Sequence, residues 1–342
     1  MHHIRRLFPC AALLVACAAL AAACGGGSDD NSSNSSASSG GSSGSGGKQF
    51  VIGYSQSNNA EPYRAQLNLQ LEYYAKQHKD LKLLPITDAH QDSSTQVRQV
   101  QNFINQKVDV LIVSPNEPGP LTAPVEQACA QHIPVVILDR SVNTQCYTSF
   151  IGGDNLAIGR KAGQEAVKLL PNGGNVVELQ GILSDTPQID RDKGFREGIA
   201  GHSNIKIVAH REAKWLKESA TPIMQQWLQQ YPKIDLVYAE NDPMALGAYL
   251  AAAGAHRADK MHFIGTDGLA IPDGGIRAVE QGQLDATFIY PTAAKEAVDT
   301  AEAIVNKQPV KKRWVLGTTQ VTKQNAAQLY KQYDFADKLK QG

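Results

Sequence analysis

The chain has 342 residues, of which 42% are hydrophobic and 19% charged, so it can bury a core, and its length suggests about two domains. Lysine and arginine together number 33, as do aspartate and glutamate, and this balance argues against a nucleic-acid partner. A mean hydropathy of −0.30 and the lack of a central apolar run argue against a protein with several membrane spans.

The first residues of the chain are typical of an export signal. Arg5 and Arg6 form a positive region, and the apolar stretch 7–20 that follows is too short to span a bilayer. Cys24 comes directly after three alanines and resembles the acylated cysteine of a bacterial lipobox. We therefore expect residues 1–23 to be the signal peptide and Cys24 to carry lipid.

Two alternatives to this assignment stay open. Cys17 fits the local lipobox pattern better but is followed by more alanine and leucine, and a plain secretory signal would carry no lipid. Residues 24–47 are rich in glycine and serine and predict a disordered tether after the lipidated cysteine. The expected location is periplasmic, with the globular part anchored to the membrane through lipid.

The rest of the chain alternates between strand and helix patterns. Continuous apolar runs, as in a parallel sheet covered on both faces, predict strands at 50–55, 81–86, 108–114, 133–139, 175–180, 205–209, 234–239, 262–266 and 284–290. Helical periodicity predicts helices at 65–77, 93–106 and 156–170, and either Asp154 or Asn155 would be the N-cap of the last. This pattern predicts an α/β fold of two doubly wound, Rossmann-like parallel-sheet lobes.

Polar side chains follow many of the predicted strands, where ligands bind in doubly wound sheets. Aspartate accepts hydrogen bonds, arginine donates them and asparagine does both, which suits the hydroxyl groups of a sugar. Tyr63, Trp215 and Tyr290 offer aromatic faces for the C–H faces of a sugar ring. For each residue taken alone, a helix cap or a surface ion pair is the alternative.

Only Cys129 and Cys146 follow the tether. Cys129 falls late in a predicted helix and Cys146 falls in the loop after the next strand, so both can approach one edge of the first lobe. An oxidising compartment favours a disulfide between them, with two buried free thiols as the alternative.

Several motifs carry a resemblance to a known family. The strings IPVVILDRSV, GGDNLAIGRKAG, NVVELQG, DRDKGF, YAENDPMALGA and FIGTDG occur in this order within residues 50–310. Through them the chain resembles sugar-binding proteins of bacterial ABC importers, in the ribose/galactofuranose branch of the type I periplasmic binding proteins. The resemblance implies three hinge crossovers between an N-terminal lobe (48–152 plus 292–314) and a C-terminal lobe (153–291 plus 315–342).

The resemblance also implies the binding residues. Asp139 and Arg140 match a pair in the first lobe that forms hydrogen bonds with sugar hydroxyl groups. Arg191 matches an arginine of the second lobe that donates hydrogen bonds to the sugar. Ser114, Tyr290 and Arg64 depart from the ribose-type pattern and argue against ribose itself. The expected ligand-binding set is Ser55, Asn59, Tyr63, Arg64, Ser114, Asp139, Arg140, Arg191, Trp215, Asn241, Asp267 and Tyr290.

We therefore expect a monomeric solute-binding protein, not an enzyme, that captures a monosaccharide between closing lobes and delivers it to an ABC permease. The alternative is a sensor that presents a sugar to a chemoreceptor or kinase, and a lesser one is a secreted sugar-processing enzyme. The histidines after the tether show no H-E-x-x-H or similar spacing, so neither a metal site nor a cofactor is expected.

Overall fold

The protein is described by a computed structural model that covers residues 49–340. The predicted signal peptide, Cys24, its alternative Cys17 and the tether lie outside the described residues. No helix within residues 49–340 combines the length and apolar character needed to cross a bilayer.

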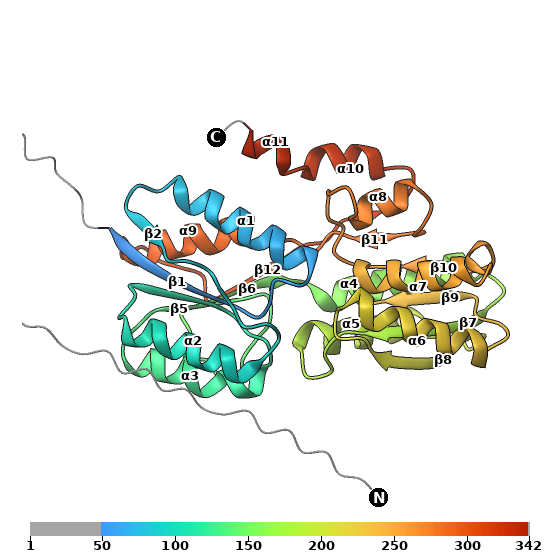
Figure 1. The fold of residues 1–342 in the computed structure, drawn as a ribbon, viewed down its shortest axis with the longest axis horizontal. Coiled ribbons are helices and arrows are strands. Elements are labelled where there is room, and N and C mark those ends of the chain that lie inside the picture. Colours follow the sequence, from blue (N-terminus) through green and yellow to red (C-terminus); the bar gives the residue numbers. More distant parts are fainter. Residues whose placement is uncertain (1–48, 341–342) are drawn as a thin grey trace, which may run out of the picture. The chain divides into compact units, whose positions relative to one another are not determined.

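The N-terminal lobe is built on a seven-stranded sheet whose paired strands are all parallel. The order is β12-β6-β5-β4-β1-β2, with β3 also pairing with β1. Helices α1 and α9 lie on one face of this sheet, and α2 and α3 lie on the other (Figure 1). The strands are β1 (Phe50–Gln56), β2 (Leu81–Leu83), β3 (Thr87–Asp88), β4 (Val110–Ser114), β5 (Val135–Leu138), β6 (Ser149–Gly153) and β12 (Arg313–Leu316), and the helices are α1 (Pro62–Lys76), α2 (Ser93–Asn105), α3 (Pro118–Ala130) and α9 (Ala294–Val305).

The C-terminal lobe is built on a four-stranded parallel sheet of order β10-β9-β7-β8. Alternate residues of its strands face two separate apolar clusters, one shared with α4 and α5 and the other with α6 and α7. The strands are β7 (Gly174–Gln180), β8 (Ile205–Glu212), β9 (Leu236–Ala239) and β10 (His262–Ile264), and the helices are α4 (Asn155–Leu169), α5 (Thr186–Gly198), α6 (Lys217–Gln230) and α7 (Asp242–Gly254).

Smaller elements complete the described part of the chain. An antiparallel pair, β11 with β13, adjoins the four-stranded sheet, and α10 packs on α8. The bounds are η1 (Ala258–Lys260), α8 (Gly275–Glu280), β11 (Thr287–Phe288), β13 (Gln320–Val321), α10 (Ala326–Tyr333) and α11 (Ala336–Leu339).

The chain passes between the lobes three times. It leaves the first sheet after β6 to form α4, returns after β11 to form α9, and leaves again after β12 to form β13. The predicted fold of two parallel-sheet lobes joined by three crossovers is therefore confirmed, while the predicted lobe boundaries stay a prediction.

Each predicted strand or helix has an observed counterpart of the same kind, whose ends differ where local chemistry decides. The predicted strand 284–290 is reduced to the two residues of β11, which pair antiparallel with β13 and not within a parallel sheet. Helix α1 begins at Pro62, three residues before the predicted start, because a proline at the first helical position fixes φ and needs no hydrogen bond for its nitrogen. Helix α4 begins at Asn155, and its N-cap is Asp154, whose carboxylate accepts a hydrogen bond from Ala157 N at 2.9 Å.

A disulfide joins Cys129 at the end of α3 to Cys146 in the loop before β6. Their Cα atoms lie 6.1 Å apart, within the usual span of about 4.4–6.8 Å. The structure thus pairs the two cysteines that the sequence predicted to pair.

Candidate functional site

Nine of the twelve predicted binding residues line one small cavity, to which both lobes contribute. Its walls are Tyr63, Arg64, Asp139, Arg140, Arg191, Trp215, Asn241, Asp267 and Tyr290, together with Glu61 and Pro187. The cavity volume is about 20 Å³, whereas ligand pockets usually enclose about 300–1,000 Å³. A sugar can therefore enter only if these side chains move apart.

The N-terminal lobe contributes a buried ion pair between Arg64 and Asp139. Arg64 Nη2 lies 2.6 Å from Asp139 Oδ2, and Arg64 Nη1 donates to Ser114 Oγ at 2.8 Å. The Tyr290 hydroxyl donates to the other carboxylate oxygen of Asp139 at 2.6 Å. Because Pro62 starts α1 early, Arg64 lies in the first helical turn and not in the loop where its sequence position suggested it.

Arg140 connects the two lobes. Its Nη1 donates to Asn116 O at 3.1 Å in the N-terminal lobe, and its Nε lies 3.1 Å from Asp185 Oδ2 in the C-terminal lobe. The carboxylates of Glu61 and Asp139 lie farther from this guanidinium, at 3.7 and 3.8 Å. Its Nη2 atom is buried and has no hydrogen-bond partner among the described residues, so it is available to a ligand.

Arg191 of α5 is held by its own lobe. Its Nε donates to Asn155 Oδ1 at 2.9 Å, and its Nη1 donates to Glu240 O at 2.5 Å. Its guanidinium carbon lies 4.6 Å from the ring centre of Tyr290 and 5.4 Å from that of Trp215. These contacts orient a fixed donor group at the cavity wall.

Trp215 is positioned by contacts on several sides. Its Nε1 donates to Asp185 Oδ2 at 3.0 Å, and its carbonyl oxygen accepts from Asn241 Nδ2 at 3.0 Å. The indole packs directly on Gly181, where a Cβ atom would lie only 2.0 Å from the ring. A glycine after β7 is therefore required for this aromatic wall.

Three cavity residues have backbone conformations that side chains disfavour. The φ angles of Asp139, Trp215 and Asp267 are 69°, 68° and 131°. Such conformations cost about 1–3 kcal/mol each and persist only where surrounding contacts hold them. Their occurrence together in one cavity supports it as the candidate functional site.

The carboxyl groups in and beside the cavity differ in their ionisation. Burial acts to raise the pKa of Asp139, but the guanidinium groups of Arg64 and Arg140 and the Tyr290 hydrogen bond outweigh it, so the pKa lies below its usual range. Burial raises the pKa of Asp185 to about 6, against the opposing effects of Arg140 and the Trp215 hydrogen bond. Burial and the nearby Asp242 raise the pKa of Asp267 well above its usual range.

The three remaining predicted residues do not line the cavity. Ser114 lies behind Arg64 as a hydrogen-bond acceptor, and Ser55 is buried in β1. Asn59 is exposed, and its Oδ1 accepts a hydrogen bond from Asn68 Nδ2 at 2.6 Å. Their roles as ligand contacts stay predictions.

Sequence reasoning missed three residues of this network: Glu61, Asp185 and Asn155. Asn155 was considered only as a helix cap, yet its side chain reaches Arg191 and lies 3.4 Å from the Tyr290 hydroxyl. Glu61 precedes Pro62, and that local signal indicates a helix start and not a ligand site. Asn241 is both a helix cap and a residue of the cavity wall, because its side chain caps α7 and also donates a hydrogen bond to the Trp215 carbonyl oxygen.

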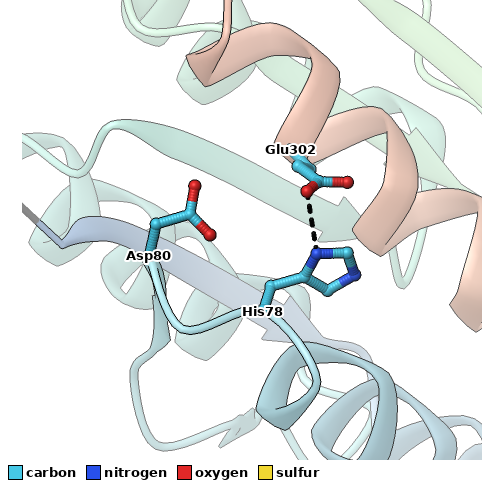
Figure 2. Close-up of side chains that lie close together, drawn as sticks. All are labelled: His78, Asp80 and Glu302. Carbon is cyan, nitrogen blue, oxygen red and sulfur yellow. Dashed lines mark ion pairs between the residues drawn. The ribbon is translucent and has the colours of Figure 1, made fainter. Parts of the chain in front are cut away.

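A group of metal-binding side-chain types lies outside the cavity (Figure 2). His78 and Asp80 come from the turn between α1 and β2, and Glu302 comes from α9. His78 Nδ1 lies 3.0 Å from Glu302 Oε1, and the ligand atoms of all three lie within 4.8 Å of one another. The His78–Glu302 contact ties this turn to α9, and the group shares no residue with the cavity.

Comparisons with known proteins agree with this architecture. Residues 52–309 match the periplasmic binding protein domain. The xylitol-binding protein of Mycolicibacterium smegmatis is 32% identical over 69% of this chain and 68% of its own length. The ribose import binding protein of Escherichia coli K12 is 30% identical over 70% of this chain and 80% of its own length.

A solved structure is also similar over most of the chain. The fructose-binding periplasmic domain of a hybrid two-component system matches with a TM-score of 0.82 and 36% identity. The match covers 86% of this chain and 97% of that domain. The described fold is thus shared with proteins whose names state sugar or polyol binding.

Proposed function

The chain belongs to the periplasmic binding protein family, a family of solute-binding proteins and not of enzymes, and we propose that it captures a monosaccharide between its two lobes. The observation that carries this proposal is the cavity itself. Hydrogen-bonding side chains from both lobes meet there with Trp215 and Tyr290. Such a set can pair with hydroxyl groups and pack against the C–H face of a sugar ring.

The charges of the site favour a neutral ligand. The cavity wall carries three guanidinium groups (Arg64, Arg140 and Arg191) and three carboxyl groups (Glu61, Asp139 and Asp267). Arg64 and Arg140 already lie against carboxylates, those of Asp139, Glu61 and Asp185. A phosphorylated or acidic sugar would add a negative charge beside the carboxylates of Glu61 and Asp139 that already pair with these arginines, at the desolvation cost of a buried charge. An uncharged pentose, hexose or polyol meets no such cost.

Delivery to an ABC permease is the role that we propose for the captured sugar. Support comes from the ribose import binding protein, whose name states import. A sensory role has its own support, because the fructose-binding relative is a domain of a two-component system. Deletion of the gene separates the two: uptake of labelled sugar falls if the protein serves a permease, whereas sugar-induced gene expression or chemotaxis falls if it serves a sensor.

Periplasmic export with a lipid anchor at Cys24 is the proposed location. It rests on the signal-like residues 1–23 and on the small residues before that cysteine. Metabolic labelling with palmitate tests it. We expect label in the wild type and in Cys17→Ser but not in Cys24→Ser, and label lost only in Cys17→Ser would move the anchor to Cys17.

A thermal-shift screen tests the binding function directly. The purified protein is heated with D-ribose, D-fructose, D-galactose, L-arabinose, xylitol and myo-inositol, each at a concentration far above a micromolar dissociation constant. Binding to the folded state alone raises the melting temperature, by an amount equivalent to about 2.7 kcal/mol at one hundred times the dissociation constant. No shift with any neutral sugar or polyol would contradict the proposal.

A further inference from the structure

Asp185 occupies the N-cap position of α5 but does not cap that helix. Aspartate is among the residues that most favour this position, because its carboxylate accepts from a free backbone N–H group. Asp92 and Asp154 do so at the starts of α2 and α4. The carboxylate of Asp185 therefore makes its contacts with groups other than the backbone of α5.

That carboxylate points instead to side chains of both lobes. Oδ2 lies 3.1 Å from Arg140 Nε of the N-terminal lobe and accepts from Trp215 Nε1 of the C-terminal lobe at 3.0 Å. Asp185 is fully buried, and Arg140 is 1% exposed. Asp185 Oδ2 is the closest carboxylate oxygen to Arg140, so it sets the direction in which this guanidinium points.

The two neighbours of Asp185 also contact the N-terminal lobe. Ser184 Oγ donates to Glu117 Oε1 at 2.9 Å, and Thr186 Oγ1 accepts from Ser141 N at 3.2 Å. Three consecutive residues thus each contact the opposite lobe, and the buried ion pair is the central contact. In a chance surface contact, we would not expect the buried charged residue, Asp185, to lie between two neighbours that also contact the opposite lobe.

We propose that residues 184–186 form an interlobe latch in which Asp185 positions Arg140 and Trp215 over the sugar and holds the closed state. This inference rests on the proposed sugar-binding function and adds a residue to it. Arg140 and Asp185 lie on different lobes, so they separate when the lobes part and meet again only on closure. The latch therefore acts on the lifetime of the closed complex.

The physical consequence is a specific kinetic effect. Removal of one partner of a buried charge pair leaves the other charge desolvated and chiefly raises the dissociation rate. Loss of a hydrogen bond to a charged group lowers the binding affinity by about tenfold or more. Association, which occurs while the lobes are open and Asp185 is solvated, changes little.

Three variants test the latch: Asp185→Asn, Asp185→Ala and Glu197→Gln. Asp185→Asn keeps an oxygen acceptor for Trp215 but removes the charge opposite Arg140. Glu197→Gln is the matched control, because Glu197 lies on the same helix and pairs with Arg160 inside its own lobe at 2.5 Å. Association and dissociation rates are measured by stopped-flow fluorescence at pH 8, where Asp185 with a pKa of about 6 is ionised.

The probe is the sugar of the six-member panel above that binds the wild type most tightly. We expect Asp185→Asn to dissociate about tenfold faster with an association rate within about twofold of the wild type, Asp185→Ala to dissociate at least as fast, and Glu197→Gln to match the wild type. The melting temperature of the sugar-free Asp185→Asn protein should stay close to that of the wild type.

Three results would count against the inference. Wild-type dissociation kinetics in Asp185→Asn overturn the latch while the sugar-binding function stands. Equal losses in Asp185→Asn and Glu197→Gln, with lower sugar-free melting temperatures, would make Asp185 a stabilising residue of α5 only. Failure of the wild type to bind any sugar of the panel instead overturns the proposed function, and the latch falls with it.

Discussion

Asp139 depends on its neighbours for both its conformation and its charge. Its left-handed backbone is held after β5, and its carboxylate lies between the Arg64 guanidinium and the Tyr290 hydroxyl. Both oxygens are buried when the lobes meet. The same residue would accept hydrogen bonds from sugar hydroxyls once the cavity opens enough to admit the ring.

Asp139→Ala should weaken sugar binding by at least about tenfold, because loss of a charged hydrogen-bond acceptor strands Arg64 in a dry site and costs about 1.5–3 kcal/mol. The melting temperature of the sugar-free protein should change little, since the side chain is solvated while the lobes are open. Calorimetric titration and thermal unfolding measure the two effects. Wild-type affinity with a lowered melting temperature would make Asp139 a structural residue.

The sequence predicted most of the residues that line the cavity but few of the contacts between them. Strand ends predicted where Asp139, Asn241 and Asp267 would gather, since the ends of parallel strands share one edge. Asp185 carried no such signal, because an aspartate before Thr186-Pro187 reads as an ordinary helix cap. Its pairing with Arg140 depends on how two lobes meet, which a local pattern does not specify.

At the scale of elements, the disulfide fastens the loop before β6 to the end of α3. The Cys129→Ser/Cys146→Ser double variant should lose about 2–4 kcal/mol of unfolding free energy, because the unfolded chain regains the freedom of a closed loop. The two cysteines lie 17 positions apart in the sequence. Urea denaturation with and without reductant measures this loss: reductant should destabilise the wild type and leave the variant unchanged. A wild type that is insensitive to reductant under unfolding conditions would contradict the prediction.

Strand β7 contains a buried acid that makes the stability of the C-terminal lobe depend on pH. Burial and the neighbouring Asp192 raise the pKa of Glu178 to about 8, although Arg196 Nη2 lies 3.0 Å from its carboxylate. Burial and Glu178 itself raise the pKa of Glu240 as well. A carboxyl group whose pKa is raised in the folded state favours folding while it is protonated, and this contribution disappears as pH rises through that pKa.

The melting temperature of the wild type should therefore fall as pH rises from about 4.5 to 8, with a loss of unfolding free energy on the order of a few kcal/mol. Glu178→Gln mimics the protonated form and should show a smaller fall, with Glu240 accounting for the rest. Calorimetric scans at several pH values compare the two proteins. Parallel curves for wild type and variant would exclude Glu178 as the titrating group.

The elements that the sequence predicted are those with continuous apolar runs. Strands β1, β4 and β9 are buried over most of their length and were recognised on that basis. Strand β12 was expected only as a crossover, because its residues alternate between exposed and half-buried at the sheet edge. Strand β6 was missed as a strand because it consists of Ser-Phe-Ile-Gly-Gly and has only two large apolar side chains.

For the whole molecule, three crossovers and a cavity of about 20 Å³ together predict motion. Side chains of both lobes already meet in the described structure, so a sugar must bind to a form in which they are apart. Lobes joined only by short crossovers can rotate about them as rigid bodies, in a hinge closure around the ligand. The latch and the site then act together, because both are complete only when the lobes are closed.

The central claim is that a sugar closes the two lobes over itself. Small-angle X-ray scattering of the purified protein, titrated with the sugar that binds most tightly in the thermal-shift screen, tests it most directly. We predict that the radius of gyration decreases and saturates at one sugar per chain, with the same midpoint as calorimetry. Tight calorimetric binding with an unchanged radius of gyration would contradict closure and place the sugar outside the interlobe cavity.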